Sequence, residues 1–122
     1  MKVLIIDDDA DIRSIARLSL SRVGGMDVIE AANGVEGVRK AREEQPDVIL
    51  LDMMMPGVGG HEVLARLGAE ESTAKIPVIV VTSHFLNEDE RRQILSRAAA
   101  VILRAELSQD VVTSAIDSAL RR

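Results

Sequence analysis

The feature that most constrains the fold of this chain is a regular alternation of short apolar runs with segments of helical periodicity. Runs that are apolar throughout fit strands covered on both faces, as the strands of a parallel sheet are. Strands and helices in strict alternation predict a parallel sheet with right-handed crossovers and helices on both of its faces. The expected strands cover residues 3–6, 26–30, 48–51, 78–81 and 101–103, of which the second is the weakest.

Capping residues and apolar spacing place the helices between these strands. Asp9 and Ser108 suit the N-cap positions of the first and last helix, and Asn87 with Glu90 forms a capping-box pattern for the fourth. Gly24-Gly25 is expected to end the first helix. The residues expected to face inward are Ile12, Ile15, Ala16, Ser19 and Val23; Val35, Val38 and Ala41; Val63, Leu64 and Leu67; Ile94, Leu95 and Ala98; and Val111, Val112, Ala115, Ile116, Ala119 and Leu120.

Length and composition exclude several classes of protein. The chain has 122 residues, the size of one ordinary domain, and its lack of cysteine excludes a disulfide framework. A formal net charge of −5 argues against direct binding of nucleic acid, and with Phe85 as the single aromatic residue no base-stacking platform can form. Because neither a signal peptide nor an apolar run of about 18 residues is found, we expect a cytoplasmic protein without a membrane segment.

Four of the five apolar runs end in side chains suited to phosphoryl chemistry. The first is followed by Asp7 and Asp8, the third by Asp52, the fourth by Thr82 and the fifth by Arg104. Because the carboxyl ends of parallel strands lie at one edge of the sheet, these side chains are expected to meet in one shallow pocket. Three carboxylates, a hydroxyl and a cation are groups that can hold a divalent metal and a phosphoryl group.

Each of these residues also has an ordinary structural interpretation when it is taken alone. The acidic run at residues 7–9 fits a helix cap, and Asp52 fits a turn. Thr82 is a common strand residue, and Arg104 fits a solvated surface charge. The functional hypothesis therefore depends on the joint pattern, because four buried strands rarely end by chance in complementary chemistry.

Along essentially its whole length the chain resembles the receiver domain of two-component response regulators, and within them the chemotaxis-regulator-like members. The resemblance is carried, in this order, by Ile6-Asp7-Asp8, by Asp52 with the Met-Met-Met-Pro-Gly that follows and then Gly60, and by Pro-Val-Ile-Val-Val-Thr-Ser at residues 77–83. It implies an α/β, flavodoxin-like fold: a doubly wound five-stranded parallel sheet of order 2-1-3-4-5 with five helices, making residues 1–122 one receiver domain. Members of the family take a phosphoryl group onto an aspartate from a sensor histidine kinase, a phosphotransfer protein or a small phosphodonor.

The resemblance also implies roles for the residues of the pocket. Asp52 is the expected phosphoacceptor, acting as a nucleophile. Asp7 and Asp8, with the Asp52 carboxylate and the backbone carbonyl of Met54, are the expected ligands of Mg²⁺, with Mn²⁺ as an alternative ion. The chain is then expected to catalyse only its own phosphorylation and dephosphorylation.

The chain departs from the family pattern at the end of its fifth strand. Arg104-Ala105 stands where the family has Lys followed by Pro, so a trans bond and a rerouted loop are expected here. Arg104 is expected to act with the Thr82 hydroxyl on the phosphoryl group; in the alternative interpretation it turns outward. Val101 stands where the family has an aromatic switch residue, which predicts an absent or altered relay from Thr82.

No catalytic role is assigned to Phe85, His84 or His61. Phe85 is interpreted as a core plug in preference to a substitute switch residue. His84 receives no definite role, and His61 is interpreted as a solvated helix residue.

Three functions remain open at this stage. The leading hypothesis is a switch that signals to a downstream protein target by contact, through its fourth helix, fifth strand and fifth helix, as a monomer or weak homodimer without direct contact to nucleic acid or membrane. The first rival is a pseudo-receiver, a protein-interaction module that works without phosphorylation. The second is a small Mg²⁺-dependent phosphatase or phosphotransferase.

Overall fold

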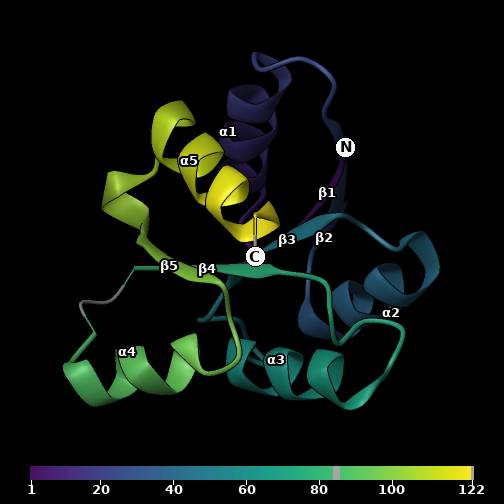
Figure 1. The fold of residues 1–122 in the computed structure, drawn as a ribbon, viewed down its shortest axis with the longest axis vertical. Coiled ribbons are helices and arrows are strands. Elements are labelled where there is room, and N and C mark those ends of the chain that lie inside the picture. Colours follow the sequence, from purple (N-terminus) through teal and green to yellow (C-terminus); the bar gives the residue numbers. More distant parts are fainter. Residues whose placement is uncertain (84–85, 122) are drawn as a thin grey trace.

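The computed structural model describes residues 1–83 and 86–121, and these form one five-stranded sheet with helices on both faces (Figure 1). The strands are β1 (Lys2–Ile6), β2 (Asp27–Ala31), β3 (Val48–Asp52), β4 (Val78–Thr82) and β5 (Ala100–Leu103). The helices are α1 (Ala10–Ser21), α2 (Gly34–Glu44), α3 (Gly60–Ala69), α4 (Glu88–Leu95) and α5 (Gln109–Leu120), with a 3₁₀ turn η1 at Arg104–Glu106. The interpretations of His84 and Phe85 lie outside the described residues.

The sheet has the doubly wound order expected from the sequence. Its strands are parallel and run β2-β1-β3-β4-β5. Ile6 lies beside Leu51, Asp52 beside Val81, and Thr82 beside Leu103. The carboxyl ends of β1, β3, β4 and β5 are therefore nearly level, so the residues that follow these strands emerge at the same edge.

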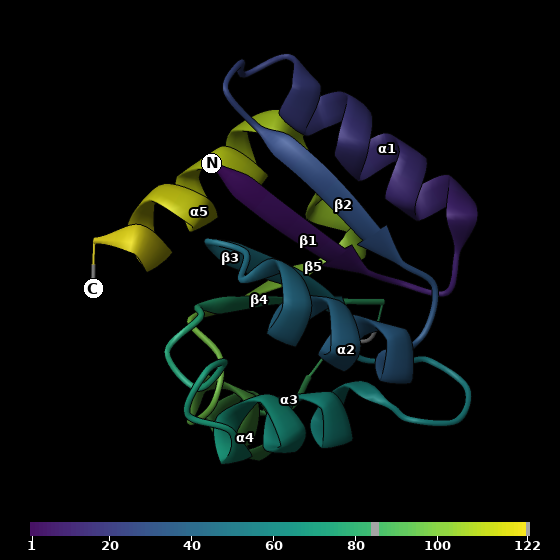
Figure 2. The same cartoon turned by 90° about the vertical axis from the view of Figure 1, so that its right-hand side faces the viewer.

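Two layers of helices cover the two faces of the sheet. Helices α1 and α5 lie on one face, and α2, α3 and α4 lie on the other (Figures 1 and 2). Alternate residues of each strand supply the two cores: Leu4 and Ile6 pack toward α2, α3 and α4, whereas Val3 and Ile5 pack toward α1 and α5. Every residue of β3 and β4 is buried, as expected for central parallel strands covered on both faces.

The expected N-caps Asp9, Asn87 and Ser108 are confirmed, and Asn33 caps α2 in addition. The Asp9 carboxylate accepts hydrogen bonds from the backbone N–H groups of the first turn of α1, and the Asn33 side chain does the same for α2. Asn87 and Glu90 form the reciprocal capping box at the start of α4, and the Ser108 hydroxyl caps α5. These caps fix where the chain leaves each strand end and enters the next helix.

The expected inward face of the first helix was right at Ala16 and wrong at Ile15 and Val23. Ile15 is 51% exposed, whereas Ala16 and Leu20 are buried. The inward line follows four-residue steps through Ala16 and Leu20, so Ile15, about 100° away around the helix, turns to solvent. Helix α1 also ends at Ser21, before the glycines, so Val23 lies beyond the helix and is 37% exposed.

The predicted inward face of α2 was wrong at one of its three residues, Val35, and glycines form part of this face. Val35 is 58% exposed, while Gly37 faces the sheet so closely that a Cβ added there would lie 2.6 Å from Cδ1 of Ile6. Val38 and Ala41 are buried as expected. Gly37 packs against Ile6 because it has no side chain. A search for apolar residues at helical spacing does not detect such a contact.

Expectations for the remaining helices were mostly confirmed. Val63, Leu64 and Leu67 are buried on α3 as expected. Leu95 and Leu120 are 38% and 40% exposed and were wrongly placed inside, because each lies at the last residue of its helix and next to the inward line. Across residues 1–83 and 86–121, no helix has the length and apolar character needed to cross a membrane.

Candidate functional site

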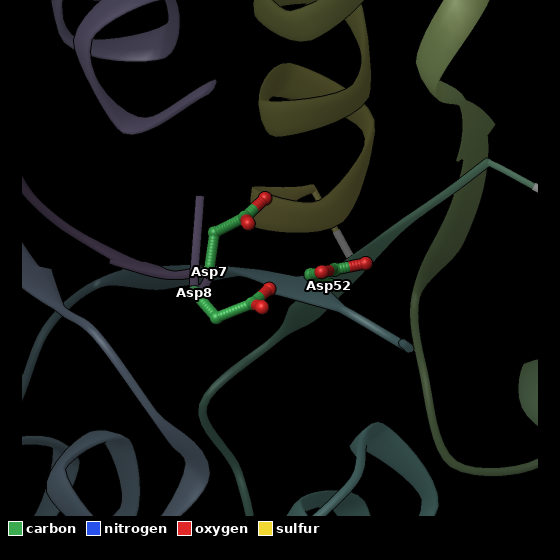
Figure 3. A group of neighbouring side chains, drawn as sticks. All are labelled: Asp7, Asp8 and Asp52. Atoms are coloured by element: carbon green, nitrogen blue, oxygen red, sulfur yellow. The ribbon is translucent and has the colours of Figure 1, made fainter. Parts of the chain in front are cut away.

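Three aspartates converge at the carboxyl edge of the sheet (Figure 3). Asp7 and Asp8 follow β1 directly, and Asp52 is the last residue of β3, the neighbouring strand. One carboxylate oxygen from each residue lies within 4.8 Å of the others. Asp7 and Asp52 are buried, with 3% and 2% of their surface exposed, whereas Asp8 is exposed to solvent. The sequence prediction that these three acids meet is confirmed.

Backbone donors from two loops orient the buried carboxylates. The backbone N–H of Asp9 donates to Oδ1 of Asp7 at 2.9 Å, and the backbone N–H of Met54 donates to Oδ1 of Asp52 at 3.2 Å. Both bonds span two residues, so each carboxylate is fixed by the loop that immediately follows its strand. In both residues the second oxygen, Oδ2, faces a different partner.

That partner is Arg104, which begins η1 directly after β5. Its Nη2 lies 3.2 Å from Oδ2 of Asp7 and 3.4 Å from Oδ2 of Asp52. The guanidinium thus lies between the two buried acids, although Arg104 is 97 residues from Asp7 in the sequence. The interpretation in which Arg104 turns outward is therefore wrong. The described peptide bonds are trans, including the one between Arg104 and Ala105, as expected.

Burial and like charge weaken the acidity of the two buried aspartates. Burial, which has the largest effect, and the nearby Asp7 and Asp8 carboxylates together raise the pKa of Asp52 from 3.8 to about 6, against the lowering effect of the Met54 N–H and the Arg104 cation. The pKa of Asp7 is also raised by burial, against the lowering effect of the Asp9 N–H and Arg104. Neighbouring carboxylates thus make both Asp7 and Asp52 harder to ionise.

Thr82 and Met54 occupy positions beside the acidic cluster. Thr82 ends β4 and is buried, and it lies beside Leu103, the residue before Arg104. Met54 has an exposed side chain between the buried Met53 and Met55, so the loop after Asp52 is anchored on both sides. Helix α3 approaches this loop closely, since a Cβ on Gly60 would lie 2.6 Å from the Cα of Met53.

A second arginine supports the cluster and was missed by the sequence analysis. Nη1 of Arg13 donates to the backbone carbonyl oxygen of Asp7 at 2.6 Å, and its Nε donates to Glu30 at 3.0 Å. Arg17, one turn further along α1, donates to the other Glu30 oxygen at 2.7 Å. The sequence did carry a signal for this contact: Arg13 and Arg17 are four residues apart on one helix, and Glu30 offers an acidic partner on the expected edge strand.

The residues present fit a divalent metal. Mg²⁺ prefers a few oxygen ligands, mostly carboxylates, and keeps several waters. Asp7, Asp8 and Asp52 offer such oxygens from two adjacent strand ends. After burial, repulsion from the Asp7 and Asp8 carboxylates contributes to the raised pKa of Asp52, and a cation bound among the three acids relieves that repulsion.

Comparison with known proteins identifies the family. The model of the response regulator receiver domain matches residues 3–117, so this chain belongs to the response regulator receiver family. Proteins of this family act as regulatory switches of two-component systems rather than as enzymes on separate substrates.

Individual relatives agree with this assignment. The chain is 43% identical over 82 residues to the DNA-binding dual master transcriptional regulator RpaA of Synechocystis, a stretch covering 67% of this chain and 34% of RpaA. It is 33% identical over 120 residues to the phosphate regulon transcriptional regulatory protein PhoB of Pseudomonas aeruginosa, covering 98% of this chain and 52% of PhoB. The chain thus spans about a third to a half of the length of these two curated relatives.

Solved structures match over nearly the whole chain. The N-terminal domain of a response regulator receiver protein from Methanoculleus marisnigri superposes with a TM-score of 0.79 at 30% identity, covering 99% of this chain and 97% of that domain. The chemotaxis protein CheY4 of Vibrio cholerae, at 24% identity, has the same fold with a TM-score of 0.86 and covers 98% of both chains.

Proposed function

We propose that this chain is a phosphorylation-controlled signalling switch of a cytoplasmic two-component system, with residues 1–122 as one receiver domain. Asp52 accepts a phosphoryl group from a sensor histidine kinase or phosphotransfer protein with the help of Mg²⁺. The observation that carries the proposal is the convergence of Asp7, Asp8 and Asp52, whose ligand oxygens lie within 4.8 Å of one another.

The proposed nucleophile is Oδ2 of Asp52. Oδ1 accepts the Met54 N–H, which fixes the plane of the carboxylate and leaves Oδ2 toward Arg104. With a pKa of about 6, Asp52 is mostly ionised at neutral pH and can attack. A new O–P bond forms as the P–N bond of the donor phosphohistidine breaks, and the electron pair of that bond stays on the departing imidazole nitrogen.

The other residues of the pocket position the group and balance its charge. Asp7, Asp8, Asp52 and the backbone carbonyl of Met54 are the proposed metal ligands, and the bound Mg²⁺ supplies charge neutralisation for the phosphoryl oxygens. Arg104 offers N–H donors to the same oxygens, and Thr82 offers a hydroxyl from the end of β4. A phosphoryl transfer with a loose transition state requires such positioning more than it requires a general base.

The proposed output surface is formed by α4, β5 and α5. Val101 on β5 is half-buried there and borders a cavity of about 230 Å³ that Leu86, Leu103 and Val111 also line. Space beside a small side chain permits repacking when the pocket changes. The proposed message is a change in this surface that a downstream protein recognises by contact.

The second candidate is a pseudo-receiver that binds a partner without phosphorylation. The observation that favours it is the Arg104 bridge, because a guanidinium paired with Asp7 and Asp52 neutralises part of the pocket without phosphate or metal. This function needs no aspartyl phosphate.

Incubation with acetyl phosphate and Mg²⁺, followed by intact mass measurement, separates these functions. The switch gives a one-phosphoryl adduct in the wild type and none in Asp52→Asn, which keeps the shape of the side chain but removes its nucleophile. A pseudo-receiver gives no adduct in either protein. An enzyme acting on an external phosphoester gives turnover without an adduct.

A further inference from the structure

The two buried carboxylates of the pocket have partners on both of their oxygens. Oδ1 of Asp7 accepts the Asp9 N–H, and Oδ1 of Asp52 accepts the Met54 N–H. Oδ2 of each residue lies within 3.4 Å of Nη2 of Arg104. Each Oδ1 keeps lone pairs beside its single N–H donor, so a metal ion that binds these carboxylates through either oxygen lies close to the Arg104 guanidinium.

Arg104 occupies the pocket as a cation would. It is the residue of the described chain that forms ion pairs with both Asp7 and Asp52, and its side chain is 28% exposed while theirs are 4% and 2% exposed. The neighbouring Arg13 has its charge directed to Glu30 and contacts Asp7 only through the backbone carbonyl. In the described part of the chain, Arg104 is thus the cation placed to offset the two buried acids.

The hydrogen bonding of the Arg104 guanidinium is incomplete. Its Nε is buried without a hydrogen-bond partner among the described residues, although a guanidinium can donate through five N–H bonds. Only Nη2 contacts the carboxylates, so the pairing is not the parallel two-bond fork that makes Arg–carboxylate pairs strong. A bound metal can therefore displace the side chain without breaking a fully paired fork.

We propose that Arg104 is an internal counter-ion that competes with the divalent metal for Asp7 and Asp52, and so sets the metal concentration at which the pocket is loaded. This inference rests on the metal site of the proposed function. A cation that must leave, or remain close to the incoming ion, weakens metal binding by charge repulsion. Removing its charge then tightens metal binding, even though the pocket loses a favourable contact.

The direct test is calorimetric titration of the full chain with MgCl₂ at neutral pH and constant ionic strength, without a phosphodonor. Arg104→Gln is expected to bind Mg²⁺ at least about tenfold more tightly than the wild type, as expected for two charges a few ångströms apart in a water-like dielectric. The matched control is Arg97→Gln, which changes the net charge equally at an exposed residue of the turn after α4. It is expected to change the dissociation constant by less than about twofold.

Equal or weaker binding of Mg²⁺ by Arg104→Gln, with measurable binding by the wild type, would overturn the inference and leave the metal site standing. Absence of binding in the wild type, in Arg104→Gln and in Asp8→Asn would instead overturn the proposed metal site itself, and the inference with it. Phosphorylation of Asp52 is measured separately. If Asp52 is not phosphorylated but Arg104→Gln binds Mg²⁺ more tightly than the wild type, the counter-ion inference is supported and the proposed switch function is not.

A measurement on the unaltered protein guards against a damaged variant. The Nε–Hε resonance of Arg104 in ¹⁵N-correlated spectra is expected to move during the Mg²⁺ titration with the same midpoint as the backbone amides of Asp8 and Met54. An unchanged Arg104 resonance, while these amides saturate, contradicts displacement of the guanidinium.

Discussion

Arg13 donates from Nη1 to the backbone carbonyl oxygen of Asp7 at 2.6 Å and so ties helix α1 to the first residue after β1. The same side chain is paired through Nε with Glu30 on the edge strand β2. One half-buried arginine thus joins three elements at the position where the acidic cluster begins. The geometry of Asp7 depends on this contact as well as on its own strand.

Replacement of Arg13 by Leu is expected to destabilise the protein by about 1–3 kcal/mol, because a charged donor is lost and the Asp7 carbonyl loses its partner. The measurement is urea unfolding at neutral pH. Arg39→Leu is the matched control, since Arg39 forms an exposed i,i+4 pair with Glu43 and its loss is expected to cost less than about 0.5 kcal/mol. Equal losses of unfolding free energy in the two variants would show that the Arg13 contacts stabilise the protein no more than an exposed ion pair does.

Two glycines in helices are expected to respond in opposite directions to substitution by Ala. At Gly37 the added Cβ meets three atoms of the buried Ile6 within 2.8 Å, so Gly37→Ala is expected to cost about 1–3 kcal/mol through overpacking. At Gly68 it meets nothing within 4 Å, so Gly68→Ala is expected to be neutral or to add up to about 1 kcal/mol from helix propensity. Thermal unfolding of both variants checks this, and a stabilised Gly37→Ala would contradict the close packing of α2.

The Gly37 contact shows where sequence reasoning was insufficient. Strand positions and three caps followed from apolar runs and capping residues, because these signals are local, and the strand order followed from the family resemblance. The exposure of Ile15 and Val35 did not follow from these local signals, because both are apolar residues that lie next to the buried line of their helix. Apolar periodicity tolerates a shift of one residue, and only packing against the sheet decides it.

The candidate site was predicted to a similar extent and for a similar reason. Asp7, Asp8 and Asp52 could be placed together because each follows a predicted strand. The direction of the Arg104 side chain could not be predicted, because it depends on the turn η1 and on the charge of residues far along the chain. Arg13 was missed, because its function comes from a backbone carbonyl that no sequence pattern marks.

The pH dependence of stability is expected to reveal the strained carboxylate of Asp52. Its pKa is about 6 in the folded protein against an ordinary 3.8, so the folded state holds this proton more tightly than the unfolded state. As pH rises from about 4 to about 6, the free energy of unfolding should therefore fall relative to that of Asp52→Asn, by at most about 3 kcal/mol. Urea unfolding of both proteins in EDTA across this range measures the difference, and a flat or rising difference contradicts the raised pKa.

Millimolar Mg²⁺ is expected to raise the melting temperature of the wild type, because a ligand that binds the folded state stabilises it by mass action. Asp8→Ala is expected to abolish this rise, since it removes one of the three clustered carboxylates. Asp11→Ala serves as the control, because Asp11 is an exposed acid of the first turn of α1 outside the cluster. A rise that persists unchanged in Asp8→Ala would remove the acidic pocket from the explanation.

The central claim is that Asp52 carries the phosphoryl group, and chemical trapping tests it most directly. After reaction with acetyl phosphate and Mg²⁺, borohydride reduces an aspartyl phosphate to homoserine, which peptide mapping locates. The account predicts homoserine at position 52 and at no other aspartate, and none when Mg²⁺ is replaced by EDTA. Homoserine at a different aspartate, or none in the presence of Mg²⁺, would contradict it.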